Sequence, residues 1–587
     1  MSLHNENNLI KPLVRRCSSD HFMFDTASTI STVSTSRSLQ SYGSILEEEG
    51  DYSSGSHDES LSTNKCYSGD TMISILGFSQ NPFADTSPTT QGRRNTAAAD
   101  LRLTMLSNFS TAYNVVSISL ALPIMQNLYP ISVSQESWCA AALVAGMICG
   151  QVAGGTLGDV LGRHWAMTVV MSCQVVAALG SALVGDIPNV ISIYTLLALW
   201  RFILGLGAGG VYPLAATMTA ESASSSCTTK VAISSMVADS SSHHQHDTAK
   251  SVALSFSLQG VGYLAVPVVA STLLLGLGSD SDWAWRLLLG LGAVPGLGLT
   301  VIRARRSSSN SCKESNTTKI STSTGFIQAT DSPSTSTASV YKAICTEPQL
   351  ARKLLGTAGC WFLFDVLFYG NTLFEPVVLA QAFGASETLV KMTRDATIVA
   401  LLALPGYLVS VAAVGRQSPR WIQCQGFLAM GILYMTLAVN YRNLAPVPLL
   451  IIYGATFFFS NYGPNTTTFL LPSLTFSPNC RSTLNGLCAA SGKAGALLGT
   501  AIFGVAANRY GHEVVFGACA TLSALGALLT LGTRVDSESN NRPQTAKAES
   551  ISDHDEEQPV ALTMHHRQGI TPMRTIYSQP SLFDFIK

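Results

Sequence analysis

A single carboxylate interrupts a long apolar stretch of the chain. Asp365 lies between Trp361 and Tyr369 in the run WFLFDVLFYG, and apolar residues extend from Leu354 to Phe383. A helix needs about 20 such residues to cross a bilayer, and an ionised Asp at mid-membrane costs about 2.5–3.5 kcal/mol on insertion scales. The three side chains are spaced four residues apart, so they share one face of a helix. We therefore expect this face to line a cavity in the protein and not to face lipid.

Other apolar segments carry polar side chains that could meet Asp365. Lys493 is the only Lys within an apolar core, and an acid and a base lower each other's burial cost when they come close. Hydroxyl and amide groups occur at Tyr212, Gln259 and Asn465. Such donors around one acid suit a small oxyanion better than a sugar or a cation. A purely structural Asp–Lys pair is the alternative.

The composition excludes several classes of protein. Only 12% of the 587 residues are charged and 47% are hydrophobic, whereas soluble domains carry about 25% charged residues. The net charge of −1 gives no support for a nucleic-acid partner. The sequence contains no nucleophile–base pair, metal-ligand cluster or phosphate-binding glycine loop of the Walker type. We therefore expect a protein of the lipid bilayer that is not an enzyme and has no metal site and no cofactor.

Twelve apolar segments follow one another from Met105 onward. A polar insert at 303–352 leaves six of them on each side, which predicts an all-α polytopic membrane protein built from two six-helix halves. The twelve segments lie at 105–129, 137–157, 165–185, 191–219, 252–276, 285–302, 354–383, 395–414, 421–440, 446–470, 484–507 and 513–533.

The polar segments complete the expected domain organisation. We expect two disordered tails, two helical bundles, a central loop and a Ser/His-rich loop within the first bundle. Lys and Arg are concentrated on the side of the tails and of both loops, so the positive-inside rule places both termini in the cytosol. The plasma membrane is the expected location, with an organellar membrane as the alternative. The boundaries are 1–100 for the N-terminal tail, 101–302 for the first bundle with its loop at 222–250, 303–352 for the central loop, 353–534 for the second bundle and 535–587 for the C-terminal tail.

Glycines repeat at helical spacing in two of the segments. Gly146, Gly150, Gly154 and Gly158 are four residues apart, as are Gly205 and Gly209 in segment 191–219. Small residues at this spacing let two helix backbones approach closely in lipid. This pattern predicts tight helix packing.

Five stretches resemble the major facilitator superfamily, and specifically its phosphate:H+ symporter branch of fungi and plants. The resemblance covers about residues 100–535. It is carried by GTLGDVLGRH from Gly155, LWRFILGLGAGGVYPLAATMTAES from Leu199, FSLQG from Phe256, GTAGCWFLFDVLFYG from Gly356 and GPNTTTFLLPSLTFSPNCRSTLNGLCAASGKAGA from Gly463.

The resemblance implies a phosphate site between the two halves. Lys493 would supply positive charge, and Asp365 would accept a hydrogen bond from a protonated phosphate oxygen, which sulfate does not have at neutral pH. Asp365 is also the candidate for proton coupling. The residues that match the branch's phosphate contacts are Tyr212, Gln259, Trp361, Asp365, Tyr369, Asn465 and Lys493.

A second set of residues resembles the superfamily's latch on the cytosolic side. Asp159 and Arg163 match the charged residues of its loop signature between the second and third helices. We expect Glu221, Arg416 and Arg481 to act with them as gating residues.

The sequence also departs from the branch at its usual acids. Val211 replaces the acid before the Tyr of the fourth helix, and Thr111 and Asn114 replace both carboxylates of a D-x-Y-D pattern in the first helix. Those acids are the expected proton-handling groups, so the usual route of proton coupling is absent.

The resemblance implies a secondary transporter of inorganic phosphate that works by alternating access. Its coupling ion could be a proton, Na+ or none. Two alternatives stay open: a transporter of the same fold for an organic phosphate or another anion, and a phosphate sensor that does not transport.

Overall fold

The computed structural model describes most of the segment in which the twelve helices are expected. These residues are 88–130, 133–185, 192–231, 240–317, 336–372, 375, 378–379, 384 and 388–533. Residues 1–87 and 534–587 lie outside them, and with them the predicted C-terminal tail and most of the predicted N-terminal tail. The described residues form helices joined by turns, with no β-strand among them.

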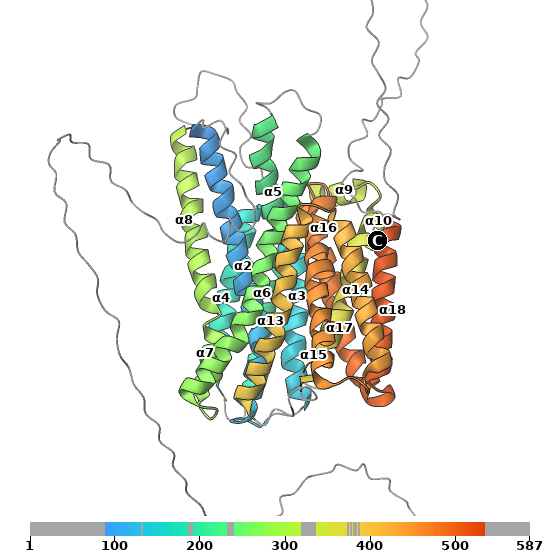
Figure 1. Cartoon of the computed structure of the whole chain (residues 1–587). Helices are drawn as coiled ribbons and strands as arrows, with labels where there is room; N and C mark the ends of the chain where they lie inside the picture. The colour runs from blue at the N-terminus through green and yellow to red at the C-terminus, as the bar shows by residue number, and fades with distance from the viewer. Residues whose placement is uncertain are drawn as a thin grey trace, which may run out of the picture. The chain divides into compact units, whose positions relative to one another are not determined.

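Successive helices of the first group alternate in direction, except that α8 continues the course of α7 (Figure 1). Its members are α2 (Pro88–Gln126), α3 (Val133–Leu161), α4 (Arg163–Ala182), α5 (Ile193–Val231), α6 (Ser240–Leu277), α7 (Asp282–Gly290) and α8 (Ala293–Thr317).

Two helices of the second group are each interrupted by one π-helical turn. Its members are α9 (Thr337–Thr346), α10 (Leu350–Leu354), η1 (Leu355–Gly359), α11 (Cys360–Thr372), α13 (Leu389–Val414), α14 (Pro419–Asn440), α15 (Pro446–Ser460), η2 (Asn461–Asn465), α16 (Thr466–Thr475), α17 (Arg481–Tyr510) and α18 (His512–Thr533).

Each of the twelve predicted segments coincides with one helix or with consecutive helices, as far as the chain is described. Nine of the described helices are long and apolar enough to cross a membrane. The other three predicted segments fall on α2, on α10–η1–α11 and on α15–η2–α16. The mean hydropathy of α2 is low because the helix contains polar residues such as Asn108 and Asn114, which are buried. The other two segments are divided by π-turns.

Helices extend into three of the segments that the sequence predicts to be tails or loops. Helix α2 begins at Pro88, inside the predicted tail. The Ser/His-rich loop expected at 222–250 is shortened from both sides, since α5 continues to Val231 and α6 begins at Ser240. Within the central loop expected at 303–352, α8 continues to Thr317 and α9 forms a further helix. Ser-rich sequence is compatible with helix where a long apolar helix already provides the nucleus.

Exposed side chains on the helices indicate the membrane. Large apolar residues such as Val176, Leu275 and Ile432 are exposed along the helices, as expected for a surface that faces lipid. Exposed tryptophans lie at the helix starts, with Trp138 and Trp283 at the beginning of α3 and α7, and Trp165 and Trp421 at the beginning of α4 and α14. Because α3 and α7 run in the direction opposite to α4 and α14, the two pairs lie at opposite ends of the bundle. Tryptophan is enriched at both membrane–water interfaces, so these pairs indicate where the interfaces lie.

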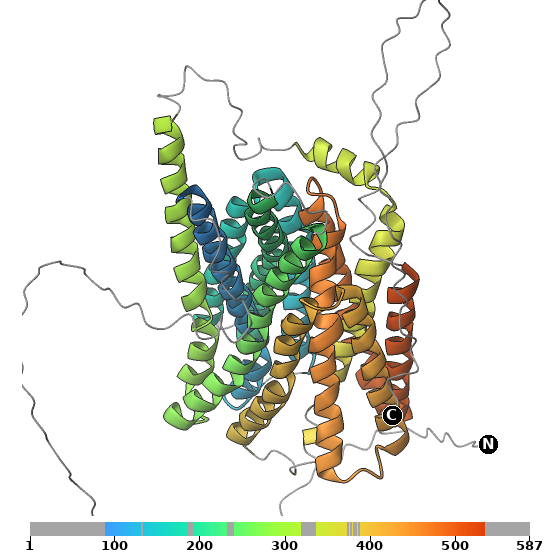
Figure 2. The same ribbon diagram turned by 45° about the horizontal axis from the view of Figure 1, so that its top comes forward.

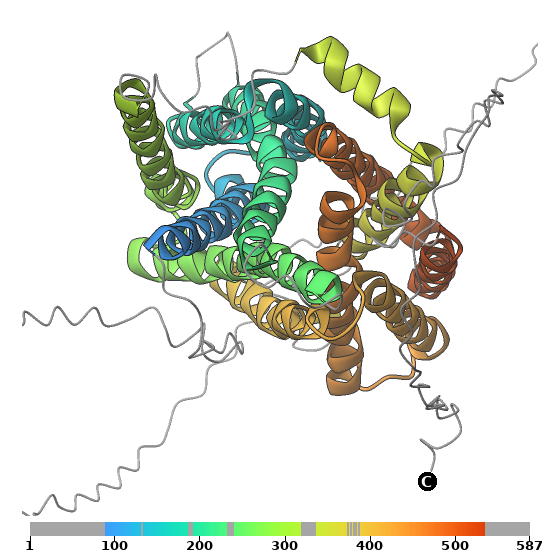
Figure 3. The same ribbon diagram turned by 90° about the horizontal axis from the view of Figure 1, so that it is seen from above.

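The two groups of helices meet along two pairs. Helices coloured blue to green gather on one side and those coloured yellow to red on the other when the bundle is seen from its end (Figure 3). Among the contacts that join them, α3 with α17 and α6 with α13 are the most extensive; the α6–α13 pair is visible in Figure 2. The space between the groups is therefore bounded by these four helices.

The predicted glycine contact is confirmed between α3 and α5. A Cβ atom on Gly146 or Gly150 would lie 2.1 or 2.2 Å from the carbonyl oxygen of Phe202 or Leu206, and one on Gly154 would lie 2.5 Å from the Cα of Gly210. Only a residue without a side chain fits at such distances.

Replacing Gly154 by Ala should therefore destabilise the protein. The added methyl group must force α3 and α5 apart, at a cost of about 1–3 kcal/mol. The same change at Gly298 of α8, where nothing lies within 4 Å of the added Cβ, should be neutral or stabilising because Ala favours a helix. Thermal unfolding of the purified protein in detergent measures both. Equal unfolding temperatures for the two variants would contradict this account of the glycine contact between α3 and α5.

Candidate functional site

A buried ion pair joins α11 and α17. The Lys493 Nζ lies 2.8 Å from Asp365 Oδ2 and donates a second hydrogen bond of 2.8 Å to Tyr369 Oη. Asp365 is 2% exposed and Lys493 is 7% exposed. Each charge removes much of the burial cost of the other. The acid and the base that the sequence placed in apolar segments thus contact each other directly.

Glycines let the two helices come close enough for this contact. A Cβ atom on Gly495 or Gly499 would lie 2.3 Å from the carbonyl oxygen of Phe362 or Val366. One turn earlier, Gly492 leaves room for the indole of Trp361, whose Cδ1 would lie 2.4 Å from an added Cβ. The backbones of α11 and α17 therefore pack directly against each other on either side of the ion pair.

The seven residues expected at a substrate site all line one cavity between the two groups of helices. The cavity also has further walls that the sequence analysis did not name. The first set is Tyr212, Gln259, Trp361, Asp365, Tyr369, Asn465 and Lys493; the second is Gln151, Phe256, Tyr263, Phe364 and Phe368.

Tyr407 connects the two sides of this cavity. Its hydroxyl accepts hydrogen bonds from Gln259 Nε2 at 3.3 Å and from Asn465 Nδ2 at 2.9 Å. Gln259 belongs to α6 and Asn465 to η2, so the buried phenol of α13 joins both groups of helices. Asn465 Nδ2 also lies 2.7 Å from Asn461 Oδ1. The hydrogen bonds to Tyr407 and Asn461 thus fix the orientation of the Gln259 and Asn465 amides, which line the cavity.

The π-turn η2 explains how two asparagines reach this position. Pro464 lacks a backbone N–H, and Gly463 has non-helical φ and ψ of −101° and −106°. A Cβ atom on Gly463 would lie 2.5 Å from the Cα of Gly426, so the bend packs against α14. Interrupted helices of this kind are typical of binding sites in membrane transporters.

Aromatic rings close the cavity beside the site. Phe256 of α6 stacks on Phe469 of α16 at 4.3 Å between ring centroids, and Tyr212 of α5 meets Phe469 edge-on at 6.5 Å. These three rings come from both groups of helices, and two of them, Tyr212 and Phe256, line the cavity.

Two departures from the resembled branch have structural consequences. Asn114 is buried, and its Nδ2 donates to the carbonyl oxygens of Ser110 at 2.9 Å and Gly292 at 2.8 Å. Val211 is also fully buried and is not among the described residues that line the cavity. Arg201 is fully buried as well and donates to the Asn114 carbonyl at 3.2 Å. Neutral groups therefore occupy these two of the three positions at which the branch has acids.

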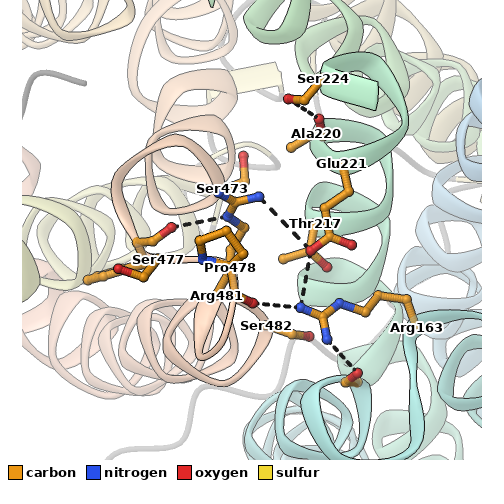
Figure 4. A network of polar contacts seen from close by, with 12 residues as sticks. Arg163, Thr217, Ala220, Glu221, Ser224, Ser473, Ser477, Pro478, Arg481 and Ser482 are labelled. Atoms are coloured by element: carbon orange, nitrogen blue, oxygen red, sulfur yellow. Dashed lines mark hydrogen bonds and ion pairs between the residues drawn. The ribbon is translucent and has the colours of Figure 1, made fainter. Parts of the chain in front are cut away.

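A network of charged residues joins the two groups of helices at one end (Figure 4). Arg163 Nη2 lies 2.9 Å from Asp159 Oδ1 and 3.1 Å from Glu221 Oε1, and it donates to the Pro478 carbonyl at 2.9 Å. Arg481 Nη1 lies 4.0 Å from the same Glu221 oxygen. Four of the five expected latch residues therefore meet in one network.

Asp159 extends this network to the start of α17. Its carboxylate accepts hydrogen bonds from the backbone N–H groups of Ser482 at 3.3 Å and Thr483 at 2.7 Å, and from the Thr483 hydroxyl at 2.6 Å. A carboxylate at a helix N-terminus is favourable because the unpaired N–H groups carry partial positive charge. Arg416, the fifth expected latch residue, is exposed and donates to Ala412 of its own helix. It does not join the network.

Glu347, which directly follows α9, contacts the turn between α16 and α17 that contributes to this network. Glu347 Oε1 lies 2.5 Å from Lys353 Nζ, and Cys480 Sγ donates to Glu347 Oε2 at 3.7 Å. Burial tends to raise the pKa of the Glu347 carboxyl, but hydrogen bonds from Lys353 and Ser477 outweigh it and hold this pKa below its usual value. The segment after the central loop is thereby tied to the turn between α16 and α17.

Two of the polar residues that sequence reasoning missed are Gln151 and Tyr407. Gln151 stands as a lone amide in the glycine-rich run CGQVAGG, and Tyr407 follows Pro405 in segment 395–414. A polar side chain inside an apolar segment was the signal available for both. His246, in the Ser/His-rich segment, lies with Nδ1 3.2 Å from the Val414 carbonyl and so contacts α13. In the described part of the chain no three His, Cys, Asp or Glu side chains gather as metal ligands.

Relatives of this chain carry transporter names. A protein named putative inorganic phosphate transporter 1-13, from Oryza sativa subsp. japonica, is 28% identical over 494 residues, which cover 78% of this chain and 92% of the relative. The inorganic phosphate transporter PT2 of Toxoplasma gondii is 28% identical over 440 residues, which cover 73% of this chain and 70% of the relative.

Solved structures share the fold at lower identity. The proton:xylose symporter XylE matches with a TM-score of 0.55 and 16% identity over 75% of this chain and 96% of that one. A partially occluded, inward-open form of XylE from E. coli matches with a TM-score of 0.52 and 15% identity over 74% of this chain and 97% of that one. The sequence model of the Major Facilitator Superfamily matches residues 104–473. The chain belongs to the Major Facilitator Superfamily.

Proposed function

We propose that this chain is a secondary transporter of inorganic phosphate, with its substrate bound in the cavity at Asp365 and Lys493. The observation that carries the proposal is the donor set of this cavity. One buried Lys and the hydrogen-bonding side chains of Tyr212, Gln259 and Asn465 surround a single carboxylate. Charge-assisted hydrogen bonds from such a set suit a small oxyanion. The names of the relatives support phosphate as that anion.

The charge balance of the site favours a proton as the coupling ion. The ion pair of Asp365 and Lys493 is neutral, so bound dihydrogen phosphate leaves one uncompensated negative charge in a medium of low dielectric constant. Uptake of one proton by Asp365 restores neutrality and removes the desolvation cost of that charge. Asp365 can therefore couple phosphate to protons without the acids missing at 111, 114 and 211. Na+ is the alternative coupling ion.

The charge distribution supports an orientation in which the latch end faces the cytosol. The start of α2 and the end of α18 lie at this end (Figure 1), and the basic residues Arg163, Arg303, Lys353 and Arg481 belong to the helix ends on this side. Positively charged residues are retained on the cytosolic side during membrane insertion. We infer cytosolic termini on this basis. The plasma membrane stays the expected location, with an organellar membrane as the alternative.

Alternating access requires the latch end to open and close. The network of Arg163, Glu221 and Arg481 crosses between the two groups of helices and holds this end closed. The cavity lies between these groups, and Phe256, which stacks on Phe469, is part of its lining. Rocking of one group against the other, with the latch broken, would expose the site to the cytosol. The chain would thus act as a carrier and not as an enzyme.

An organic phosphate is less well supported as the substrate. The sequence suggested it because Val211 replaces a larger acid. Val211 does not line the cavity within the described part of the chain, so its smaller side chain adds no space there.

Cells or vesicles without a phosphate carrier of their own should take up labelled phosphate when they contain this protein. We expect saturable uptake that increases as the external pH falls, because Asp365 must bind a proton for each phosphate. Uptake is measured across pH with Na+ replaced by choline. A strict requirement for Na+ would contradict proton coupling, and absence of phosphate uptake under every condition would overturn the proposed function.

Asp365→Asn and Lys493→Ala should each abolish uptake. Each change removes one partner of a buried pair, leaving Lys493 or Asp365 without its counter-charge at a cost of about 3–5 kcal/mol, and each alters the substrate site. Initial uptake rates are compared at equal amounts of protein in the membrane. Gln423→Leu is the control, because this buried amide bonds to Thr467 and Thr530 away from the cavity. Normal uptake by both site variants would show that the site is elsewhere.

Glu221→Gln should loosen the latch end. The substitution removes the negative charge that Arg163 and Arg481 share, so the closed arrangement loses stability relative to the open one. Hydrogen–deuterium exchange in the turn at 476–483 should become faster. Arg416→Gln provides a matched loss of one charge outside the network and should leave this exchange unchanged. The same exchange rate in both variants would contradict the assignment of the latch.

A further inference from the structure

Helices α6 and α13 are joined by hydrogen bonds near both ends of their contact. Ser271 Oγ donates to Thr393 Oγ1 at 2.8 Å near one end. At the other end, where α6 begins and α13 ends, His246 Nδ1 lies 3.2 Å from the carbonyl oxygen of Val414. Helix α5 also ends here, so this is the end of the bundle that carries the latch. The histidine thus joins the two groups of helices at the latch end.

The partner of His246 is the C-terminus of a helix. Val414 is the last residue of α13, and among the described residues no backbone N–H group outside the helix is bonded to its carbonyl oxygen. The carbonyl oxygens of a final helical turn lack intrahelical partners and carry partial negative charge. Lys250, one turn further along α6, places its Cδ 3.6 Å from the position of a Cβ on Gly415. Two basic side chains of the first group therefore lie over the negative end of a helix of the second group.

The other contact between the groups at this end has the reverse arrangement. There the carboxylate of Asp159, near the end of α3, accepts hydrogen bonds from the backbone at the start of α17. Between α6 and α13 the side chain belongs to the helix that begins and the backbone group to the helix that ends. Carboxylates are ordinarily ionised at neutral pH, whereas histidine side chains change their charge between about pH 5 and pH 8. The α6–α13 contact therefore contains the side chain that can respond to the pH of the cytosol.

Charged side chains of both signs surround this contact. Three of them, on Arg102, Asp247 and Arg416, are exposed to solvent, which weakens their effect on His246. The end of α13 is thus the charged group that His246 contacts directly. The described charged side chains at this end, on the elements packed against α6, are Asp247 and Lys250 on α6, Arg416 after α13, Asp100 and Arg102 on α2, and Glu221 on α5, while α16 has none.

We propose that His246 is a pH sensor that stabilises the closed form of the latch end when it gains a proton. A positive charge at the C-terminus of α13 strengthens the contact, and opening of this end separates α6 from α13 and loses it. Protonation should therefore favour the closed form about tenfold. The stabilisation is present at acidic pH and is lost as the pH rises.

The sensor would act as a brake on uptake. This meaning rests on the proposed function, in which each phosphate enters together with a proton and acidifies the cytosol. Release of phosphate into the cytosol requires the latch end to open. A protonated His246 delays that opening, so uptake slows when protons accumulate inside.

Hydrogen–deuterium exchange of the purified full-length protein in lipid nanodiscs tests the sensor without phosphate. Protection factors at 410–416, which correct for the intrinsic pH dependence of exchange, should rise about tenfold from about pH 7.5 to pH 5.5. His246→Gln keeps an N–H donor but cannot gain a charge, so its protection should not change with pH. His164→Gln alters an exposed histidine at the start of α4, at the same end, and should behave as wild type.

A second variant keeps the test informative if His246→Gln loses the contact altogether. His246→Lys carries a positive charge at both pH values, so its protection should be as high at about pH 7.5 as that of the wild type at about pH 5.5. Equal pH dependence in wild type and His246→Gln would overturn the sensor. Low protection of His246→Lys at about pH 7.5 would overturn it as well.

Uptake of labelled phosphate into proteoliposomes tests the brake. With the pH on the opposite side fixed, acidification of the latch side should slow initial uptake more in wild type than in His246→Gln. The same slowing in both proteins would overturn the brake. Wild-type protein that takes up no phosphate would instead overturn the proposed function and leave the exchange result in place, so the two failures are distinguishable.

Discussion

The buried ion pair of Asp365 and Lys493 imposes the strictest demand on the rest of the structure. Two charges in an apolar bundle are tolerated when they are in direct contact and when their remaining hydrogen-bonding capacity is met. Contact requires α11 and α17 to pack backbone against backbone, which the glycines at 495 and 499 allow. The remaining capacity of Lys493 is met in part by Tyr369. A short side chain on either helix would separate the charges, so the glycine seam and the ion pair depend on each other.

The polar side chains of the cavity are held by both groups of helices. Tyr407 joins Gln259 to Asn465, and the π-turn η2 directs Asn465 inward. Such a cavity changes shape when the groups move, since its two walls do not belong to one rigid part. This gives a physical route from substrate binding to rearrangement: an anion that contacts both walls favours one relative position of the groups over the other.

The sequence was sufficient for the helices and for the charged centre of the site. Apolar segments of adequate length predicted the positions of the twelve spans, and the spacing of Trp361, Asp365 and Tyr369 predicted their common face. Helix ends in polar sequence were less predictable, because α5, α6 and α8 continue beyond the apolar segments that nucleate them. Tyr407 and Gln151 were missed because their importance depends on which helices lie opposite them. Local sequence contains no information on that arrangement, and the same limit explains why Arg416 was assigned to the latch.

The contact between α3 and α17 near the latch is made largely by backbone. Gly155 and Gly486 bring the main chain of one helix against the other, with the Ser482 carbonyl 2.5 Å from the position of a Cβ on Gly155. Glycines and main chain supply no large apolar side chain at this point of contact, so the hydrophobic effect adds little there to keeping this end shut. The balance between closed and open forms then depends mainly on the half-buried charges of Arg163, Glu221 and Arg481. Ionic strength, which screens such charges, becomes a determinant of how long the closed form persists.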